Sequence, residues 1–221
     1  MTNPEKQFFK HDIVYFEQFV SPEDSVNLVE YFKQAEPWNR VAFFGSWGMS
    51  LAEEDPALEK FNLPKDYFVG LTARLKAAVE DAHNVETRVV STHAQKWETG
   101  AYANWHSDNS SLDGTPSAWE VSKYVCLLYL NEDYGGGELA FRDHNLTISP
   151  STGMLVTFPG GIDNVHGVNE VTSGIRWTIG AFWDRADAIY SDERRQEWAD
   201  ERAFVKQQQE VQYAEWEKNG N

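Results

Sequence analysis

The sequence contains a single cysteine, Cys126, and no run of eighteen apolar residues. One cysteine excludes an intrachain disulfide and a zinc site built from thiolates. The missing apolar run argues against a membrane-spanning helix, and residues 1–6 show no charged-then-apolar leader pattern. We therefore expect a soluble, cytoplasmic protein that has no membrane partner.

Basic residues are also scarce, since 19 Lys and Arg stand against 35 Asp and Glu and give a formal net charge of −16. A surface of this sign repels phosphate backbones and anionic lipids, so nucleic acid is excluded as a general partner. A small anionic ligand at a local positive group is still allowed. The partners that remain are small molecules, peptides and proteins.

The chain of 221 residues is long enough for one domain. We expect residues 1–190 to form it and residues 191–221 to form a charged helical extension that begins at the N-cap Ser191. The extension has only a few apolar residues, without a clean helical period: Trp198, Val205, Val211 and Trp216. This pattern leaves open a solvated tail, a helix docked on the core, and an oligomer formed through the helix.

Two helices are expected in the first half of the domain, after a strand at 12–20. Ser21 and Pro22 form a helix start, and a second apolar-faced helix follows at 64–83. Residues 38–63 fit an irregular aromatic strand or loop. Two helices ahead of a run of strands predict a layer packed on the outside of a sheet.

From Thr87 onward the sequence consists of short strands separated by turn clusters such as Gly135-Gly136-Gly137. The expected strands are 88–97, 104–108, 121–130, 138–141, 146–148, 154–158, 165–168 and 175–183. Eight short strands without intervening helices predict an antiparallel sandwich or a jelly roll, and we take the jelly roll, a double-stranded β-helix, as the expected core. The fold class is thus mainly β, with N-terminal helices outside the core and a charged C-terminal helix.

Among the six histidines, His106 and His166 attract attention. His106 lies two positions before Asp108, and residues i and i+2 of a strand point to the same face. His166 arrives on a later strand. Two histidines and one carboxylate can hold ferrous iron on one face and leave the opposite positions open. The other histidines have no partner at ligand spacing and are expected to be ordinary: His11, His83, His93 and His144.

Arg176 follows His166 by ten residues on the last expected strand. Alternate residues of a jelly roll point into its interior, where an arginine is costly unless it meets an anion. The free carboxylate of a bound dicarboxylate would satisfy Arg176 through two parallel hydrogen bonds.

Several short motifs occur in a definite order: Gly100 before His106-Ser107-Asp108, then Leu128-Tyr129-Leu130-Asn131, Gly136-Gly137-Glu138-Leu139, Pro150, Gly153, Phe158, His166, Gly174-Ile175-Arg176-Trp177 and Trp183. In this order, segment 97–183 resembles the Fe(II)- and 2-oxoglutarate-dependent dioxygenases of the prolyl 4-hydroxylase-like branch. Residues 19–24 also resemble the strand-to-helix entry of that branch.

The resemblance implies that His106, Asp108 and His166 hold Fe(II). It implies that Arg176 pairs with the distal carboxylate of 2-oxoglutarate and that Tyr129 helps to hold it. The remaining cosubstrate would be O2, with ascorbate as a reductant. Trp97 stands where the family commonly has a tyrosine that reaches the cosubstrate.

A second departure is that Tyr102 is one residue out of register with another frequent tyrosine, whose place is taken by Ala103. Both departures border the site, so the substrate pocket is expected to differ from that of a collagen-type enzyme. Segment 109–120 follows the metal ligands and is a candidate substrate lid. Four tryptophans could exclude water from the site: Trp105, Trp119, Trp177 and Trp183. For Trp177 and Trp183 the simpler interpretation is that they are ordinary core residues.

The implied activity is hydroxylation of a peptidyl or free amino acid, proline first, coupled to decarboxylation of 2-oxoglutarate to succinate and CO2. A related oxygenase acting on another small molecule is an alternative. Halogenation is disfavoured because a halide would need the coordination site of Asp108. A non-catalytic metal-binding jelly roll is the third interpretation, and Arg176 argues against it because such a module needs no anion-pairing arginine.

Overall fold

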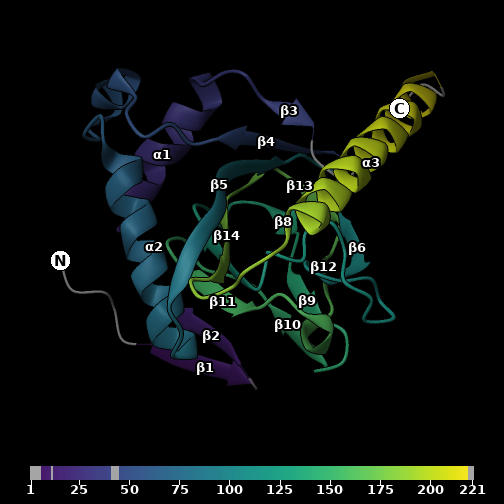
Figure 1. Cartoon of the computed structure of the whole chain (residues 1–221). Coiled ribbons are helices and arrows are strands. Elements are labelled where there is room, and N and C mark those ends of the chain that lie inside the picture. Colours follow the sequence, from purple (N-terminus) through teal and green to yellow (C-terminus); the bar gives the residue numbers. More distant parts are fainter. Residues whose placement is uncertain (1–5, 11, 41–44, 219–221) are drawn as a thin grey trace.

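The computed structural model describes residues 6–10, 12–40 and 45–218, and this part of the chain folds into antiparallel sheets flanked by helices (Figure 1). The helices are α1 (Pro22–Gln34), α2 (Tyr67–His83) and α3 (Asp192–Lys218), with 3-10 turns η1 (Pro56–Phe61) and η2 (Ile162–Asn164). The strands are β1 (Lys6–Lys10), β2 (Ile13–Phe16), β3 (Asn39–Arg40), β4 (Ser46–Ser50), β5 (Thr87–Trp97), β6 (Ala103–His106), β7 (Tyr124–Tyr129), β8 (Gly135–Gly136), β9 (Leu139–Phe141), β10 (Leu146–Ile148), β11 (Leu155–Pro159), β12 (His166–Val168), β13 (Val171–Ser173) and β14 (Arg176–Arg185).

Two sheets form the body of the molecule. The larger has eight strands in the order β1-β2-β11-β7-β14-β5-β4-β3, and the smaller has four in the order β10-β9-β12-β6. A two-stranded ribbon, β13-β8, lies beside them. Apolar residues from both large sheets, such as Val125, Leu139 and Phe158, form one buried cluster. The predicted jelly roll with flanking helices is confirmed.

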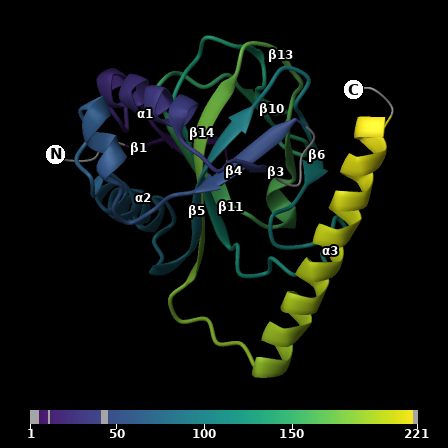
Figure 2. The same cartoon turned by 90° about the horizontal axis from the view of Figure 1, so that it is seen from above.

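Helices α1 and α2 cover one face of the eight-stranded sheet (Figures 1 and 2). The side chain of Ser21 accepts a hydrogen bond from the backbone N–H of Asp24 (3.0 Å), so the predicted cap of α1 is confirmed. Trp177 and Trp183 of β14 lie in the buried cluster beneath these helices. Both tryptophans are therefore core residues, as the simpler interpretation predicted.

The structure corrects the sequence-based element boundaries in three places. The strand expected at 104–108 ends at His106, so Asp108 lies beyond it. The strand expected at 12–20 is the four-residue β2. Residues 38–63 contain two short strands and η1 rather than one irregular element. His11, Phe43 and Phe44, which the sequence interpretation also considered, lie outside the described residues.

No helix in the described part of the chain combines the length and the apolar character that a membrane crossing needs.

The first half of α3 docks on the body of the protein. Ser191 caps the helix by accepting a hydrogen bond from the backbone N–H of Arg194 (3.2 Å). Trp198 is only 5% exposed and packs edge-on against Tyr190, with ring centroids 4.8 Å apart. Further along the helix Phe204 is 61% exposed. Of the alternatives that the sequence left open, a docked helix describes this first half.

The docking surface of α3 is part of the candidate lid. The guanidinium of Arg194 donates from Nε (3.1 Å) and Nη2 (2.9 Å) to one carboxylate oxygen of Glu120. Arg202 Nε donates to the carbonyl oxygen of Ala118 (2.8 Å). Figure 2 shows α3 as the yellow helix along one side of the molecule. The helix thus holds the segment that follows Asp108 from outside.

Removing the Trp198 side chain is expected to release this segment. Trp198→Ala deletes the buried anchor of α3, at a cost of about 3–5 kcal/mol for a large buried aromatic residue. We expect the backbone amides of residues 109–122 to exchange hydrogen at least about tenfold faster in the variant, measured by mass spectrometry. Phe204→Ala, on the exposed part of α3, is the matched control. Unchanged exchange in Trp198→Ala would show that the segment is ordered without α3.

Candidate active site

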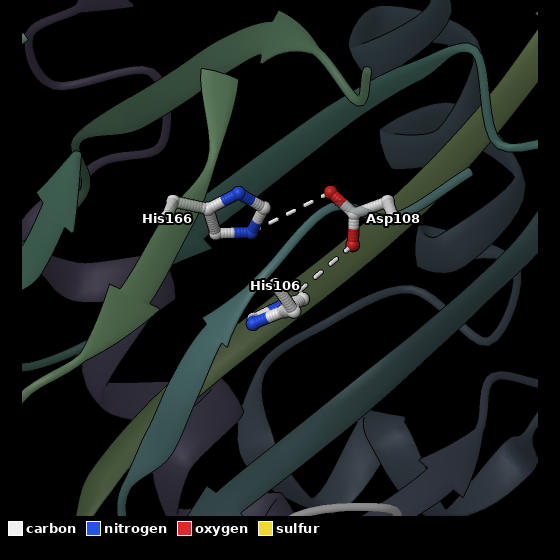
Figure 3. A group of neighbouring side chains, drawn as sticks. All are labelled: His106, Asp108 and His166. Carbon is white, nitrogen blue, oxygen red and sulfur yellow. Dashed lines mark ion pairs between the residues drawn. The ribbon is translucent and has the colours of Figure 1, made fainter. Parts of the chain in front are cut away.

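The side chains of His106, Asp108 and His166 converge in one group (Figure 3). His106 and His166 are directly opposite each other in the antiparallel register of β6 and β12. His166 Nε2 lies 3.5 Å from Asp108 Oδ2, and His106 Nε2 lies 3.9 Å from Asp108 Oδ1. One candidate ligand atom from each residue lies within 4.8 Å of the other two. The arrangement has the size of a single-ion site.

Both imidazole rings are oriented by the backbone. His106 Nδ1 lies 2.7 Å from the carbonyl oxygen of Asn104, and His166 Nδ1 lies 2.9 Å from that of Asn164. A carbonyl oxygen can only accept, so Nδ1 carries the proton in each ring and Nε2 presents its lone pair. Burial lowers the pKa of His166 to about 4, so its ring is neutral at neutral pH. A neutral imidazole is the form that binds a metal.

Asp108 owes its position to Gly160 rather than to strand geometry. The carbonyl oxygen of Gly160 accepts hydrogen bonds from the backbone N–H groups of Asp108 (2.9 Å) and Asn109 (3.2 Å) and from the hydroxyl of Ser107 (2.9 Å). The N–H of Gly160 donates to the carbonyl of Lys123 (2.9 Å). Gly160 therefore holds the chain at Asp108 and Asn109, where the candidate lid begins, and at Lys123, three residues after it ends, and it fixes the carboxylate of Asp108.

Arg176 lies in a cavity that also contains the side chains of His106, Asp108 and His166, and it is only 1% exposed. Its guanidinium carbon is 5.2 Å from the ring centroid of Trp97 and 5.0 Å from that of Tyr129. Nη2 donates to the hydroxyl oxygen of Tyr129 (3.3 Å). Burial raises the pKa of Tyr129 to about 12, so this hydroxyl keeps its proton and can also donate. The structure thus brings Arg176 into contact with the other two residues expected at the cosubstrate, Tyr129 and Trp97.

One cavity joins the histidine–aspartate group to Arg176. Its wall contains both polar and apolar side chains: Gln95, Trp97, Ala103, His106, Asp108, Val125, Leu127, Leu139, His166, Val168, Arg176 and Phe182. The polar groups thus lie at defined places in a mostly apolar enclosure, as is usual for small-ligand sites.

The sequence interpretation did not identify two residues near the site, Gln95 and Tyr134. Gln95 accepts from the hydroxyl of Thr178 (3.1 Å), and its Nε2 lies 3.0 Å from Nε2 of His93. Tyr134 packs beside Arg176, and burial raises the pKa of its hydroxyl. Gln95 lies two residues from Trp97 on β5, so strand alternation could have found it. Tyr134 lies outside any strand and gave no such signal.

The remaining described histidines are not members of the metal-ligand group. His83 contacts the hydroxyl of Thr157 (3.1 Å), His144 contacts the amide oxygen of Asn164 (3.0 Å), and His93 contacts Gln95. Burial lowers the pKa of His83 and of His93 to about 4. The expectation that these three are ordinary histidines is consistent with their contacts.

The residues of the cavity fit a metal ion and a dicarboxylate. Asp108 Oδ2 is buried without a hydrogen-bond partner among the described residues, and so are Nε and Nη1 of Arg176. Buried polar atoms of this kind are costly unless a ligand satisfies them. A cation beside Asp108 and a carboxylate beside Arg176 would satisfy all three atoms.

Part of the sequence is similar to known oxygenases. Residues 92–184 match the family model described as the 2OG-Fe(II) oxygenase superfamily. Human prolyl 3-hydroxylase 3 is 37% identical over 117 residues, which cover 48% of this chain and 15% of that protein. Human prolyl 3-hydroxylase 2 is 32% identical over 117 residues, covering 48% and 16%. The chain therefore aligns with only about a sixth of the length of these relatives.

Solved structures of similar fold cover more of the chain. The viral collagen prolyl hydroxylase of Paramecium bursaria Chlorella virus-1, in its 2OG complex, has a TM-score of 0.58 at 15% identity and covers 80% of this chain and 97% of that one. A Pseudomonas putida prolyl-4-hydroxylase has a TM-score of 0.57 at 20% identity, covering 80% and 94%. At these identities the similarity establishes the shared fold.

The region similar to the 2OG-Fe(II) oxygenase superfamily contains all three residues of the metal-ligand group and Arg176. Over this region the sequence is similar to prolyl 3-hydroxylases, and the fold is similar to that of prolyl hydroxylases of known structure.

Proposed function

We propose that the protein is an Fe(II)- and 2-oxoglutarate-dependent oxygenase that hydroxylates proline within a peptide or protein. One observation carries the proposal: the group formed by His106, Asp108 and His166 shares a cavity with a buried Arg176, two of whose nitrogens have no hydrogen-bond partner among the described residues. A site that only held a metal would have no need for a guanidinium in this place. The non-catalytic interpretation is correspondingly weakened.

In this proposal His106, Asp108 and His166 hold Fe(II) through their Nε2 and carboxylate atoms. Arg176 and Tyr129 hold the distal carboxylate of 2-oxoglutarate. Iron, O2 and 2-oxoglutarate together supply the oxidation that replaces a substrate C–H by C–OH, while 2-oxoglutarate becomes succinate and CO2. Ascorbate belongs to the same proposal as an auxiliary reductant.

The chain's own residues bind, orient and exclude water. The two backbone carbonyls that accept from Nδ1 fix the imidazole rings, so that neither ligand has to reorient on binding. The ring of Trp97 supports the guanidinium of Arg176 from one side. The apolar side chains of Val125, Leu127 and Phe182 line the cavity and limit the access of water.

Proline as the substrate is supported by the relatives. The sequence similarity is to prolyl 3-hydroxylases. A prolyl hydroxylase from Trichoplax adhaerens, in complex with a hypoxia inducible factor peptide fragment, shares the fold with a TM-score of 0.57 at 16% identity, covering 83% of this chain and 86% of that one. A peptide substrate also agrees with the predicted class of partner. A cytoplasmic location and an oligomer formed through α3 stay predictions.

The direct test incubates the purified protein with Fe(II), ascorbate, 2-oxoglutarate and a library of proline-containing peptides. We expect succinate and a matching gain of one oxygen on a proline, detected by mass spectrometry. Hydroxylation of non-prolyl compounds alone would favour the alternative of another small-molecule substrate. No succinate under any of these conditions would contradict the oxygenase assignment.

Arg176→Met is expected to weaken the apparent affinity for 2-oxoglutarate by about a hundredfold, because truncating one partner of a buried charged pair costs about 2–5 kcal/mol. The unfolding free energy of the ligand-free variant should be equal to or higher than that of the wild type, because an apolar side chain replaces a buried guanidinium with two nitrogens that lack a hydrogen-bond partner among the described residues. Titration of 2-oxoglutarate by calorimetry and thermal unfolding give the two quantities. Arg185→Met, an exposed arginine at the end of the same strand, is the control. An unchanged affinity in Arg176→Met would refute the role of Arg176.

A further inference from the structure

A groove of about 320 Å³ lies outside the proposed iron site, on strands β6 and β12. Its lining consists of Tyr102, Ala103, Asn104, Trp105, Gly167, Val168, Asn169 and Glu170. Two of these residues, Ala103 and Val168, also line the cavity that contains the metal-ligand group. The Trp105 groove, as we call it, therefore abuts the active-site cavity without sharing its ligands.

Aromatic side chains stand exposed at this groove. Trp105 is 45% exposed and Tyr102 is 38% exposed. Trp105 directly precedes His106, so the two side chains point to opposite faces of β6. The tryptophan predicted to form a dry wall inside the site instead faces the groove. Large exposed aromatic residues beside a site are typical of recognition surfaces.

Gly167 keeps the floor of the groove open. A Cβ atom at this position would lie 2.8 Å from the carbonyl oxygen of Ala103 and 3.3 Å from the ring of Trp105. The register between β12 and β6 shifts between His166 and Val168, so Gly167 sits at an irregularity in the ladder. The bare backbone at Gly167 leaves space for the Trp105 ring and for a ligand over it.

The charged groups at the groove are acidic. Glu170 lines it, and Asn169 donates from its amide to the carboxylate of Glu138 (3.0 Å). The lining contains neither lysine nor arginine. The whole chain has a formal net charge of −16. The groove therefore combines aromatic faces with carboxylates, which is the chemistry that recognises a cation.

We propose that the Trp105 groove binds an arginine side chain of the polypeptide substrate, a few residues from the proline that is hydroxylated. The inference rests on the proposed function in taking the substrate to be a polypeptide. An arginine guanidinium stacks on aromatic rings and pairs with a carboxylate through two hydrogen bonds, so it uses both Trp105 and Glu170. Ala103 and Val168 line both the groove and the active-site cavity, and β6 is the edge strand of its sheet, so a polypeptide that passes around this edge reaches both.

The test measures binding without iron or turnover. N-acetyl-arginine methylamide and its neutral isostere N-acetyl-citrulline methylamide are titrated separately, and the indole N–H signal of Trp105 is followed by NMR. We expect the arginine probe to bind at least about fivefold more tightly than the citrulline probe, as a cation–π contact at an exposed site allows. Trp105→Ala and Glu170→Gln are each expected to remove most of this preference, with nearby backbone amide signals reporting binding in Trp105→Ala. Glu53→Gln, an exposed carboxylate elsewhere on the surface, should keep it.

Equal binding of the two probes, or a preference that survives in both groove variants, would overturn the inference. The outcome is independent of catalysis. If no prolyl peptide is hydroxylated but the arginine preference persists, the proposed function is wrong, and the assignment of the groove as an arginine-binding site is supported. If prolyl peptides are hydroxylated without any arginine preference in binding, the groove assignment fails alone.

Discussion

Asp108→Ala is expected to abolish turnover and to weaken divalent metal binding by more than about a hundredfold. Loss of residues that merely support metal ligands already costs about 10–100-fold in affinity, and Asp108 supplies the only carboxylate of the three-residue group. The two imidazoles that remain offer neither the charge nor the third ligand atom. Titration with Fe(II) under anaerobic conditions, or with Co(II), gives the affinity, and succinate formation gives the turnover.

The matched control for this variant is Asp113→Ala, because Asp113 is an exposed carboxylate of the same segment. It should bind metal as the wild type does. The melting temperature of metal-free Asp108→Ala should be no lower than that of the metal-free wild type. The reason is that Asp108 Oδ2 has no hydrogen-bond partner to lose among the described residues. Metal affinity that is equal in Asp108→Ala and Asp113→Ala would show that the ligand group is misidentified.

Gly160→Ala is expected to lower activity by about a hundredfold although Gly160 is not a metal ligand. An added Cβ would lie 2.6 Å from the carbonyl oxygen of Ser122 and 3.1 Å from Cβ of Asp108. Backbone has to move to relieve the first contact, and an overpacked site of this kind costs about 1–3 kcal/mol. Since Gly160 also holds Asp108 through its carbonyl, the carboxylate shifts with it, and a displacement of about 1 Å can cost 100-fold in rate.

Gly161→Ala is the control that the chain itself offers. The nearest atoms to an added Cβ there are those of the Asn109 amide, at 3.9 Å, which is an ordinary contact. We expect near wild-type unfolding free energy and metal affinity in Gly161→Ala, and a reduction of both in Gly160→Ala. Equal behaviour of the two variants would mean that the Gly160 carbonyl does not position Asp108.

The sequence was sufficient for the fold class because its strands are short, regularly spaced and separated by glycine turns. It also singled out His106, His166 and Arg176, since each lies on a strand whose alternation decides which way the side chain points. Their roles as iron and cosubstrate ligands stay predictions. Strand alternation therefore predicted the direction in which each of these side chains points.

Asp108 was placed on a strand by the same reasoning, and this was wrong. The strand ends at His106, and the position of the carboxylate depends on hydrogen bonds to Gly160, which lies 52 residues later in the chain. The sequence left the docking of α3 as one of several alternatives for a related reason. Its few apolar residues have no helical period, and what anchors it is the single Trp198 together with arginine contacts to Glu120 and Ala118. Contacts between distant segments of this kind leave no local pattern.

The proposed site draws its two ends from different layers of the molecule. His106 and His166 lie on the four-stranded sheet, whereas Arg176 lies on the eight-stranded sheet. A ligand that contacts both the histidines and Arg176 therefore has to match the distance between the two sheets. We expect substitutions at members of the apolar cluster that do not line the cavity, such as Ile148, to change that spacing and with it the length of molecule that the cavity accepts. Under the proposed function, we expect cosubstrate selectivity to depend on how the two sheets pack as well as on the residues that touch the ligand.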